Sequence, residues 1–105
     1  MKKFENIYIL KGSMAESEAL KEIERIKEYF EGTTILNDEF GGYQGFKKLA
    51  YEIKGEKTGY FYITNFMATE QDILNIERNL RINDNIIKFI TIRKNQEAKN
   101  GEFKI

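Results

Sequence analysis

The residues of this sequence that could do chemistry are lysines, arginines, tyrosines and carboxylates, because the chain contains neither histidine nor cysteine. Histidine is the commonest general base and transition-metal ligand, and cysteine supplies thiolate chemistry and most zinc sites. The carboxylates that could act as catalytic groups or metal ligands are Glu5, Asp38, Glu39 and Asp84, but their spacing matches no calcium loop, P-loop or nucleophile motif. We therefore predict no catalytic residue, no metal site and no cofactor.

Basic side chains are unevenly spread in a chain whose formal net charge is zero. Acids outnumber bases between residues 13 and 32, whereas bases outnumber acids in residues 2–11 and 78–94. A local basic patch of this kind can bind a polyanion without any overall positive charge. The strongest candidate cations of the last stretch are Arg81, Lys88, Arg93 and Lys94.

Four further lysines flank the segment GFKKLAYEIK and the turn after it: Lys47, Lys48, Lys54 and Lys57. Lysines in such places often solvate the edge of a sheet and discourage pairing with other chains. Lysines in such places can also bind phosphate groups. From the residues alone both roles stay open, with the edge role favoured.

Aromatic rings are frequent on the same predicted strands, at Phe4, Tyr8, Tyr51, Tyr60, Phe61 and Tyr62. Rings on RNA-recognition sheets stack on bases, but the run of basic, glycine and aromatic residues typical of those proteins is missing here. Core packing or contact with a protein partner is the better interpretation of most of these rings.

The first predicted elements are a strand over residues 3–11 and a helix over residues 14–31. Ser13 and Glu16 have the capping-box spacing expected at the start of that helix. Residues 33–53 then form a long strand, and its glycines at positions 41, 42 and 45 predict a bulge, bend or short loop.

The second half repeats this order. Residues 55–59 predict a hairpin turn, and residues 60–66 the strand that follows it. A second helix begins at Thr69, with Asp72 as another possible capping partner, and residues 86–93 form the last strand.

The order strand, helix, strand, strand, helix, strand predicts an α+β fold of the ferredoxin-like split β-α-β type (βαββαβ). Two helices would cover one face of a four-stranded antiparallel sheet and leave the other face open. We expect one domain over residues 1–94 and a polar, flexible tail over residues 95–105. No apolar run approaches the roughly 18 residues of a membrane span and no signal-peptide cleavage site follows MKKFENIYIL, so we expect a cytoplasmic location.

The open face should carry apolar surface. Alternation places Tyr60, Tyr62, Thr64 and Phe66 on one face and Phe61, Ile63 and Asn65 on the other. The sequence does not decide which set is buried. Either choice leaves aromatic or aliphatic side chains exposed, and an exposed apolar surface of this extent usually marks a partner site.

Several ordered pieces of the sequence resemble one known family. LAYEIK (residues 49–54), GYFYITNF (residues 59–66) and LRINDNIIKFITIR (residues 80–93) resemble the sixth protein of the bacterial small ribosomal subunit, a protein of the 30S platform. The opening KFENIYIL is similar to the beginning of that family. The resemblance spans residues 2 to about 96, nearly the whole chain.

The resemblance implies a structural constituent of the small ribosomal subunit that is not an enzyme. It implies binding to small-subunit ribosomal RNA of the platform, in the central domain, as a heterodimer with the eighteenth small-subunit protein. The RNA-binding residues would be Lys2, Lys47, Lys48, Lys54, Lys57, Arg81, Lys88, Arg93 and Lys94. The protein-partner face would be Phe4, Tyr8, Tyr51, Tyr60, Phe61 and Tyr62. Two alternatives stay open: a stand-alone dimeric module that binds a small ligand, and a divergent paralogue with a changed partner.

Overall fold

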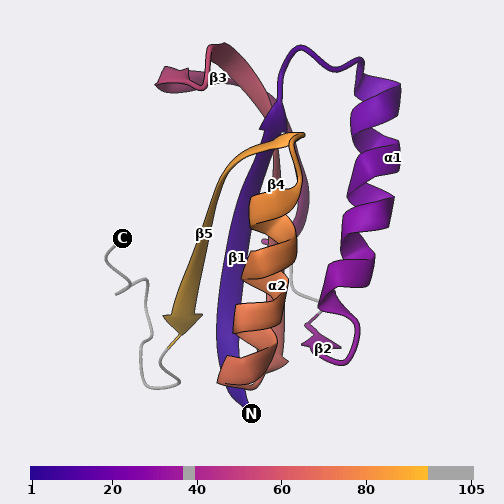
Figure 1. Ribbon diagram of the computed structural model, residues 1–105, viewed down its shortest axis with the longest axis vertical. Helices are drawn as coiled ribbons and strands as arrows, with labels where there is room; N and C mark the ends of the chain where they lie inside the picture. Colours follow the sequence, from indigo (N-terminus) through magenta and orange to yellow (C-terminus); the bar gives the residue numbers. More distant parts are fainter. Residues whose placement is uncertain (37–39, 95–105) are drawn as a thin grey trace.

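The structure is a computed structural model that describes residues 1–36 and 40–94. The tail predicted over residues 95–105 lies outside the described residues. In chain order the elements are β1 (Lys2–Lys11), α1 (Glu16–Ile26), the 3-10 helix η1 (Lys27–Phe30), β2 (Thr34–Ile35), β3 (Gly42–Ile53), β4 (Glu56–Ala68), α2 (Glu70–Ile82) and β5 (Ile86–Lys94) (Figure 1). In these ranges no helix is long and apolar enough to cross a membrane.

The strands form one antiparallel sheet with β1 in the middle, between β4 and β5. β2 and β3 both pair with the outer edge of β4, so the sheet is four strands wide although it contains five strand segments. This confirms the predicted ferredoxin-like arrangement. The predicted interruption is also confirmed, because Gly42 and Gly45 have φ angles of 100° and the register shifts between Tyr43 and Gly45.

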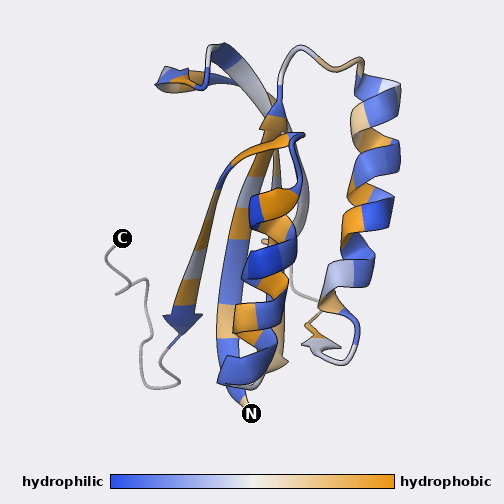
Figure 2. Ribbon diagram, in the orientation of Figure 1, coloured by the Kyte–Doolittle hydropathy of each residue, from blue (hydrophilic) through white to orange (hydrophobic). Residues whose placement is uncertain are grey.

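Both helices lie on one face of the sheet (Figure 1), and apolar and polar residues alternate along each of them (Figure 2). The buried residues of both helices belong to the same core as those of the sheet. The layer between helices and sheet contains Phe4, Tyr8 and Leu10 of β1 and Tyr60 and Phe66 of β4, none more than 5% exposed. Each such burial stabilises the fold by about 1.5–3 kcal/mol, so this layer is the main core. The alternating set that includes Tyr60 and Phe66 is therefore the buried one.

The two helices begin in different ways. Thr69 caps α2 with a complete capping box, in which the Asp72 amide donates to Thr69 Oγ1 at 3.1 Å and the Thr69 amide donates to the Asp72 carboxylate at 3.0 Å. The box predicted for Ser13 and Glu16 is wrong, because α1 begins at Glu16 itself. Ser13 instead donates from its amide and hydroxyl to the Glu56 carboxylate, which ties the β1–α1 loop to the start of β4.

A two-residue turn joins β3 and β4. Lys54 and Gly55 both have positive φ angles, 51° and 82°, and this type of turn matches the natural twist of a hairpin. The turn is therefore tighter than the one predicted over residues 55–59, and β4 begins at Glu56. As a result, Lys54 stands at the tip of the hairpin.

Candidate nucleic-acid interface

The sheet face opposite the helices carries an apolar groove of about 240 Å³. Its walls come from four strands and include Ile7, Ile9, Leu49, Tyr51, Phe61 and Ile90. The hairpin end of β3 contributes one wall, since its register with β4 is interrupted between Lys48 and Ile53. Below, this is called the apolar groove. It is the exposed apolar surface that the sequence predicted for the open face.

Two lysines lie over aromatic rings of this face. Lys88 Nζ donates a hydrogen bond to Tyr51 Oη at 2.8 Å and lies 5.3 Å from the centre of the Tyr51 ring. Lys47 Nζ lies 5.5 Å from the centre of the Phe61 ring. Such cation–π contacts are worth about 0.5–1 kcal/mol at exposed sites, so they orient the lysines without removing their charge from solvent.

A second cavity, also of about 240 Å³, adjoins the groove and is basic. Lys54 from the hairpin tip, Arg81 from the last turn of α2 and Lys88 from β5 line it together. The Arg81 guanidinium lies 5.7 Å from the centre of the Phe89 ring. Among the residues that the structure describes, none of these three bases is in an ion pair. We call this cluster the upper end, and its three cations are free to meet phosphate oxygens.

Three other predicted bases lie together at the opposite end of the sheet, where β1 begins and β5 ends. We call these residues, Lys2, Arg93 and Lys94, the lower end. Glu70 accepts from Lys2 Nζ at 3.1 Å and lies 3.9 Å from the Arg93 guanidinium. Lys94 lies 3.7 Å from the Glu5 carboxylate. The hydrogen bond from Lys2, with the nearby charges of Lys2 and Arg93, holds the pKa of Glu70 below its ordinary value. Carboxylates thus offset the positive charge here.

The predicted protein-partner face divides between the two sides of the sheet. Tyr51 and Phe61 lie on the open face and line the apolar groove. Phe4, Tyr8 and Tyr60 do not, because they are buried beneath the helices. Tyr62 stacks on Tyr8 on the helix side, with ring centres 5.5 Å apart. Burial makes Phe4, Tyr8 and Tyr60 core residues, and Tyr62 is a half-buried ring that packs against them.

Three more of the predicted RNA-binding lysines lie along the β3–β4 hairpin. Lys47, Lys48 and Lys57 are exposed on β3 and β4. Lys48 lies opposite Thr58, and Lys47 lies opposite Gly59. They extend the positive charge of the upper end along the hairpin.

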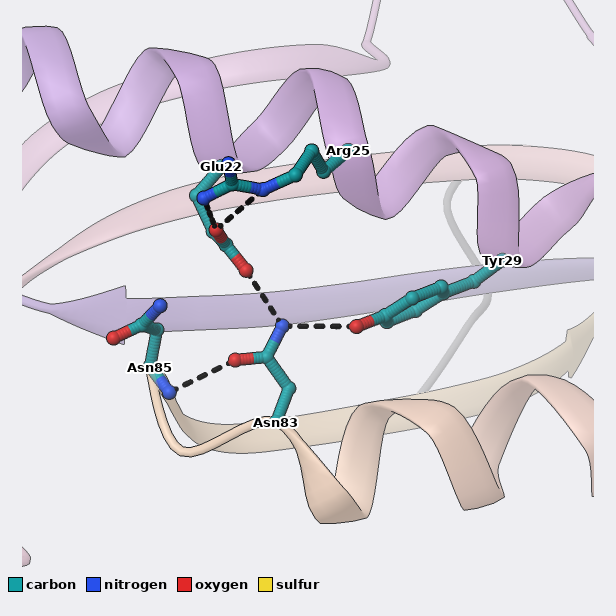
Figure 3. Close-up of polar contacts among 5 residues, drawn as sticks. All are labelled: Glu22, Arg25, Tyr29, Asn83 and Asn85. Carbon is teal, nitrogen blue, oxygen red and sulfur yellow. Dashed lines mark hydrogen bonds and ion pairs between the residues drawn. The ribbon is translucent and has the colours of Figure 1, made fainter.

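A polar cluster around the buried Glu22 holds the α2–β5 loop next to the upper end (Figure 3). Glu22 of α1, with a side chain 7% exposed, accepts hydrogen bonds from Arg25 and, at 2.8 Å, from Asn83 Nδ2. Asn83 Nδ2 also donates to Tyr29 Oη at 3.0 Å, and Asn83 Oδ1 accepts from the Asn85 amide at 2.9 Å. Arg81 precedes this loop and Lys88 follows it. The cluster therefore positions the backbone from which both bases extend.

Burial alone raises the pKa of Glu22, but the hydrogen bonds from Arg25 and Asn83 outweigh it and hold that pKa below the ordinary value. Glu22 is therefore a buried, charged acceptor. The sequence carried one signal of this, since Glu22 shares a helix face with the apolar Ala19, Ile23 and Ile26. Its partner Asn83 lies on a loop far along the chain, so no local sequence pattern indicates the contact.

The described part of the chain contains no group of three or more acidic, histidine or cysteine residues placed to hold a metal ion. What it does contain is a ferredoxin-like sheet whose open face combines an apolar groove with a neighbouring cluster of free cations. This combination defines a binding domain suited to an apolar partner and a polyanion.

Comparison with known proteins agrees with that class. The family model of ribosomal protein S6 matches residues 3–93, so the chain belongs to this family. Small ribosomal subunit protein bS6 of Helicobacter pylori is 36% identical over 98 residues, a match that covers 89% of this chain and 65% of that relative. The bS6 protein of a Sulfurovum species is 32% identical over 99 residues, covering 90% and 75%.

The fold has a close counterpart among solved structures. The crystal structure of 30S ribosomal protein S6 from Thermotoga maritima superposes with a TM-score of 0.80 at 26% identity, covering 89% of this chain and 87% of that one. The family resemblance predicted from LAYEIK, GYFYITNF and LRINDNIIKFITIR is thereby confirmed.

Proposed function

We propose that the protein is a structural, non-enzymatic constituent of the small ribosomal subunit in the cytoplasm. Family membership over residues 3–93 supports this role, as do relatives named small ribosomal subunit protein. It binds ribosomal RNA of the platform together with the eighteenth small-subunit protein.

The observation that carries the RNA part is the upper end. Lys54, Arg81 and Lys88 come from three separate elements and line one cavity, and none is in an ion pair within the described residues. Phosphate contacts from such bases release counterions, so affinity falls as salt rises. The lower end contributes little, because Glu70 and Glu5 already occupy its bases.

The apolar groove is the surface proposed for the protein partner. Tyr51 and Phe61 offer rings beside the aliphatic walls of Ile9 and Leu49. Apolar anchors in a desolvated pocket, ringed by polar contacts, are the usual centre of a protein interface. The groove adjoins the upper end, so one surface would serve both partners.

The test is binding to a labelled platform fragment of small-subunit RNA, with and without the eighteenth protein of the same organism, across a salt series. We expect tight binding with the partner present and a slope of log affinity against log salt at least as steep as about −2.7, from three phosphates at roughly −0.9 each. A chain that binds neither RNA nor partner at low salt, and instead forms a homodimer, contradicts the proposal and favours a stand-alone ligand-binding module.

A further inference from the structure

A second apolar surface lies on the helix side of the sheet, away from the apolar groove. α1 runs down to the margin of the sheet where β2 lies (Figure 1), and a cavity of about 310 Å³ opens between them. Its walls come from α1 and η1 on one side and from the sheet on the other, and they include Ile26, Lys27, Phe30, Ile35 and Tyr62.

One face of α1 extends this cavity toward the start of the helix. Lys27 lines the cavity, and Leu20 and Glu16 precede it by seven and eleven residues, so the three share a helix face. Tyr43 Oη donates to the Glu16 carboxylate at 3.0 Å, which shows that this face looks toward β3. At about 1.5 Å per residue the face is about 16 Å long, the span of roughly five extended residues.

Four large apolar side chains stand exposed along this margin. Tyr43 lies opposite the cavity residue Tyr62 in the β3–β4 register, and the Phe46 ring centre lies 4.9 Å from that of Tyr60. The exposed fractions are 43% for Leu20, 55% for Ile35, 37% for Tyr43 and 52% for Phe46. We call the cavity and these four side chains the side groove. Apolar surface gathered in this way usually marks a contact site.

The charges around the side groove favour a basic occupant. Glu16 lies at one end of it, and Glu31 follows the cavity residue Phe30 at the other end. Within the described residues neither carboxylate is in an ion pair, whereas Lys27 is paired with Glu24 at 2.8 Å. Phosphate groups would be repelled by the two free carboxylates, so this side of the protein suits a positively charged partner.

We propose that the side groove binds an extended protein segment in which arginine alternates with apolar residues. Successive side chains of an extended segment point to opposite sides, so the apolar set fills the groove while the long arginine side chains reach back to its rim. An arginine there pairs with the Glu16 carboxylate and lies over the exposed ring of Tyr43 or Phe46. This protein contact is separate from the apolar groove and the upper end, and it does not depend on the function proposed above.

The test is a fluorescence titration of the full chain with a short labelled peptide in which arginine and leucine alternate. In one control peptide serine replaces leucine, and in another glutamate replaces arginine. The arginine–leucine peptide should bind, and added salt should weaken it because the charges lie at an exposed rim. Each control peptide should bind about tenfold more weakly, since it lacks either the apolar or the positively charged half of the contact.

Matched variants of the protein locate the binding. Leu20→Ser should weaken it about tenfold, and Glu16→Gln about fivefold, the scale of one exposed ion pair. Leu74→Ser removes an apolar side chain of α2 that is 58% exposed, and Glu77→Gln removes a carboxylate from the same helix, and neither should change the affinity. Circular dichroism of each variant checks that the fold is retained.

Several results would overturn the inference. One is no binding of the arginine–leucine peptide at low salt, and another is an equal loss from Leu20→Ser and Leu74→Ser, which would indicate no defined site. A dimer in sedimentation that Leu20→Ser abolishes would assign the side groove to a second copy of this chain. Tighter binding of an oligouridine strand, lost in Leu20→Ser, would assign it to RNA, with Lys48 next to Phe46 as the phosphate contact.

The outcome is distinct from that of the proposed function. If the peptide fails to bind while the platform RNA binds, only the side groove loses its assignment. If the platform RNA fails to bind while the peptide binds with the expected pattern of variants, the proposed function is wrong and the side groove stands.

Discussion

The two ends of the sheet carry similar numbers of basic side chains and differ in what surrounds them. At the upper end Lys54, Arg81 and Lys88 gather around one cavity with no ion pair among the described residues. At the lower end Lys2, Arg93 and Lys94 all lie within 4 Å of a carboxylate, at 3.1, 3.9 and 3.7 Å.

The difference shows that a count of bases does not locate a polyanion site. Exposed ion pairs are worth little to stability, typically below about 1 kcal/mol, yet the two carboxylates of the lower end repel phosphate and offset most of the attraction of its three bases. An end with free cations can therefore bind RNA where an end with the same number of paired cations does not.

The largest expected effect comes from removing each set of bases in turn. Changing Lys54, Arg81 and Lys88 together to glutamine should reduce the salt slope of RNA binding by about 2.7, since each lost phosphate contact removes about 0.9. Changing Lys2, Arg93 and Lys94 to glutamine should leave the slope nearly unchanged. Fluorescence titrations of the platform fragment at several salt concentrations measure both.

The two triple variants are matched, because each removes three positive charges. Equal losses from both would show that overall charge, and not the arrangement of free cations, determines RNA binding. A larger loss from the lower-end variant would reverse the assignment.

The second effect concerns the stability of the fold, and it compares the polar contacts near the upper end with an ion pair of the lower end. Asn83→Ala removes three hydrogen bonds from the polar cluster and leaves the Glu22 carboxylate short of a donor. It should lower the free energy of unfolding by about 2 kcal/mol, in the range for a hydrogen bond to a buried charge. Lys94→Ala breaks the pair with Glu5, whose atoms lie 3.7 Å apart, and should cost below about 1 kcal/mol. Urea denaturation of both variants tests the difference.

A third effect is the response of stability to acid. The pKa of Glu22 is held below its ordinary value of 4.5, so its contribution is fully present above that ordinary value and is lost as the pH falls through the lower, folded-state pKa. The Glu22→Gln variant should therefore lose less stability than the wild type on acidification. Unfolding free energies measured from about pH 6 to about pH 3 decide this, and parallel curves would show that folding does not lower the pKa of Glu22.

The smallest expected effect comes from making the lower end more like the upper end, by removing a carboxylate from it. Glu70→Gln frees Lys2 and Arg93 from their shared carboxylate. RNA affinity at low salt should rise slightly, and the salt slope should steepen by less than about 1, the effect of a single added phosphate contact. An unchanged affinity would indicate that the lower end does not face RNA. Glu77→Gln, the same change elsewhere on α2, is the control for charge alone.

Much of the fold followed from local patterns. The alternation in residues 60–66, the glycines near position 45 and the Thr69 capping box each act within a few residues, so they could be interpreted from the sequence. The Ser13 box failed because a competing acceptor, Glu56, reaches Ser13 from a strand far along the chain. The capping-box spacing considers only residues a few positions apart, so it cannot indicate an acceptor from a distant strand.

The site was harder to predict for the same reason. The rings of Phe4, Tyr8 and Tyr60 have the residue types of a partner surface, and only the position of the helices makes them core residues. Candidate bases can be recognised in the sequence by residue type, but their separation into free and paired sets depends on Glu70 and Glu5. Glu5 meets Lys94 through the β1–β5 register, in which Lys3 lies opposite Lys94, and Glu70 reaches Lys2 and Arg93 from the start of α2.

That register also determines how the protein should respond to force. β1 is the central strand, and its beginning lies beside the end of β5, with Lys3 opposite Lys94 and Leu10 opposite Ile86. A load applied at residues 3 and 94 therefore opens the ladder one hydrogen-bonded pair at a time, beginning at the lower end. The domain should behave mechanically as a zipper that yields to small forces, and the upper end would be the last part of that ladder to separate.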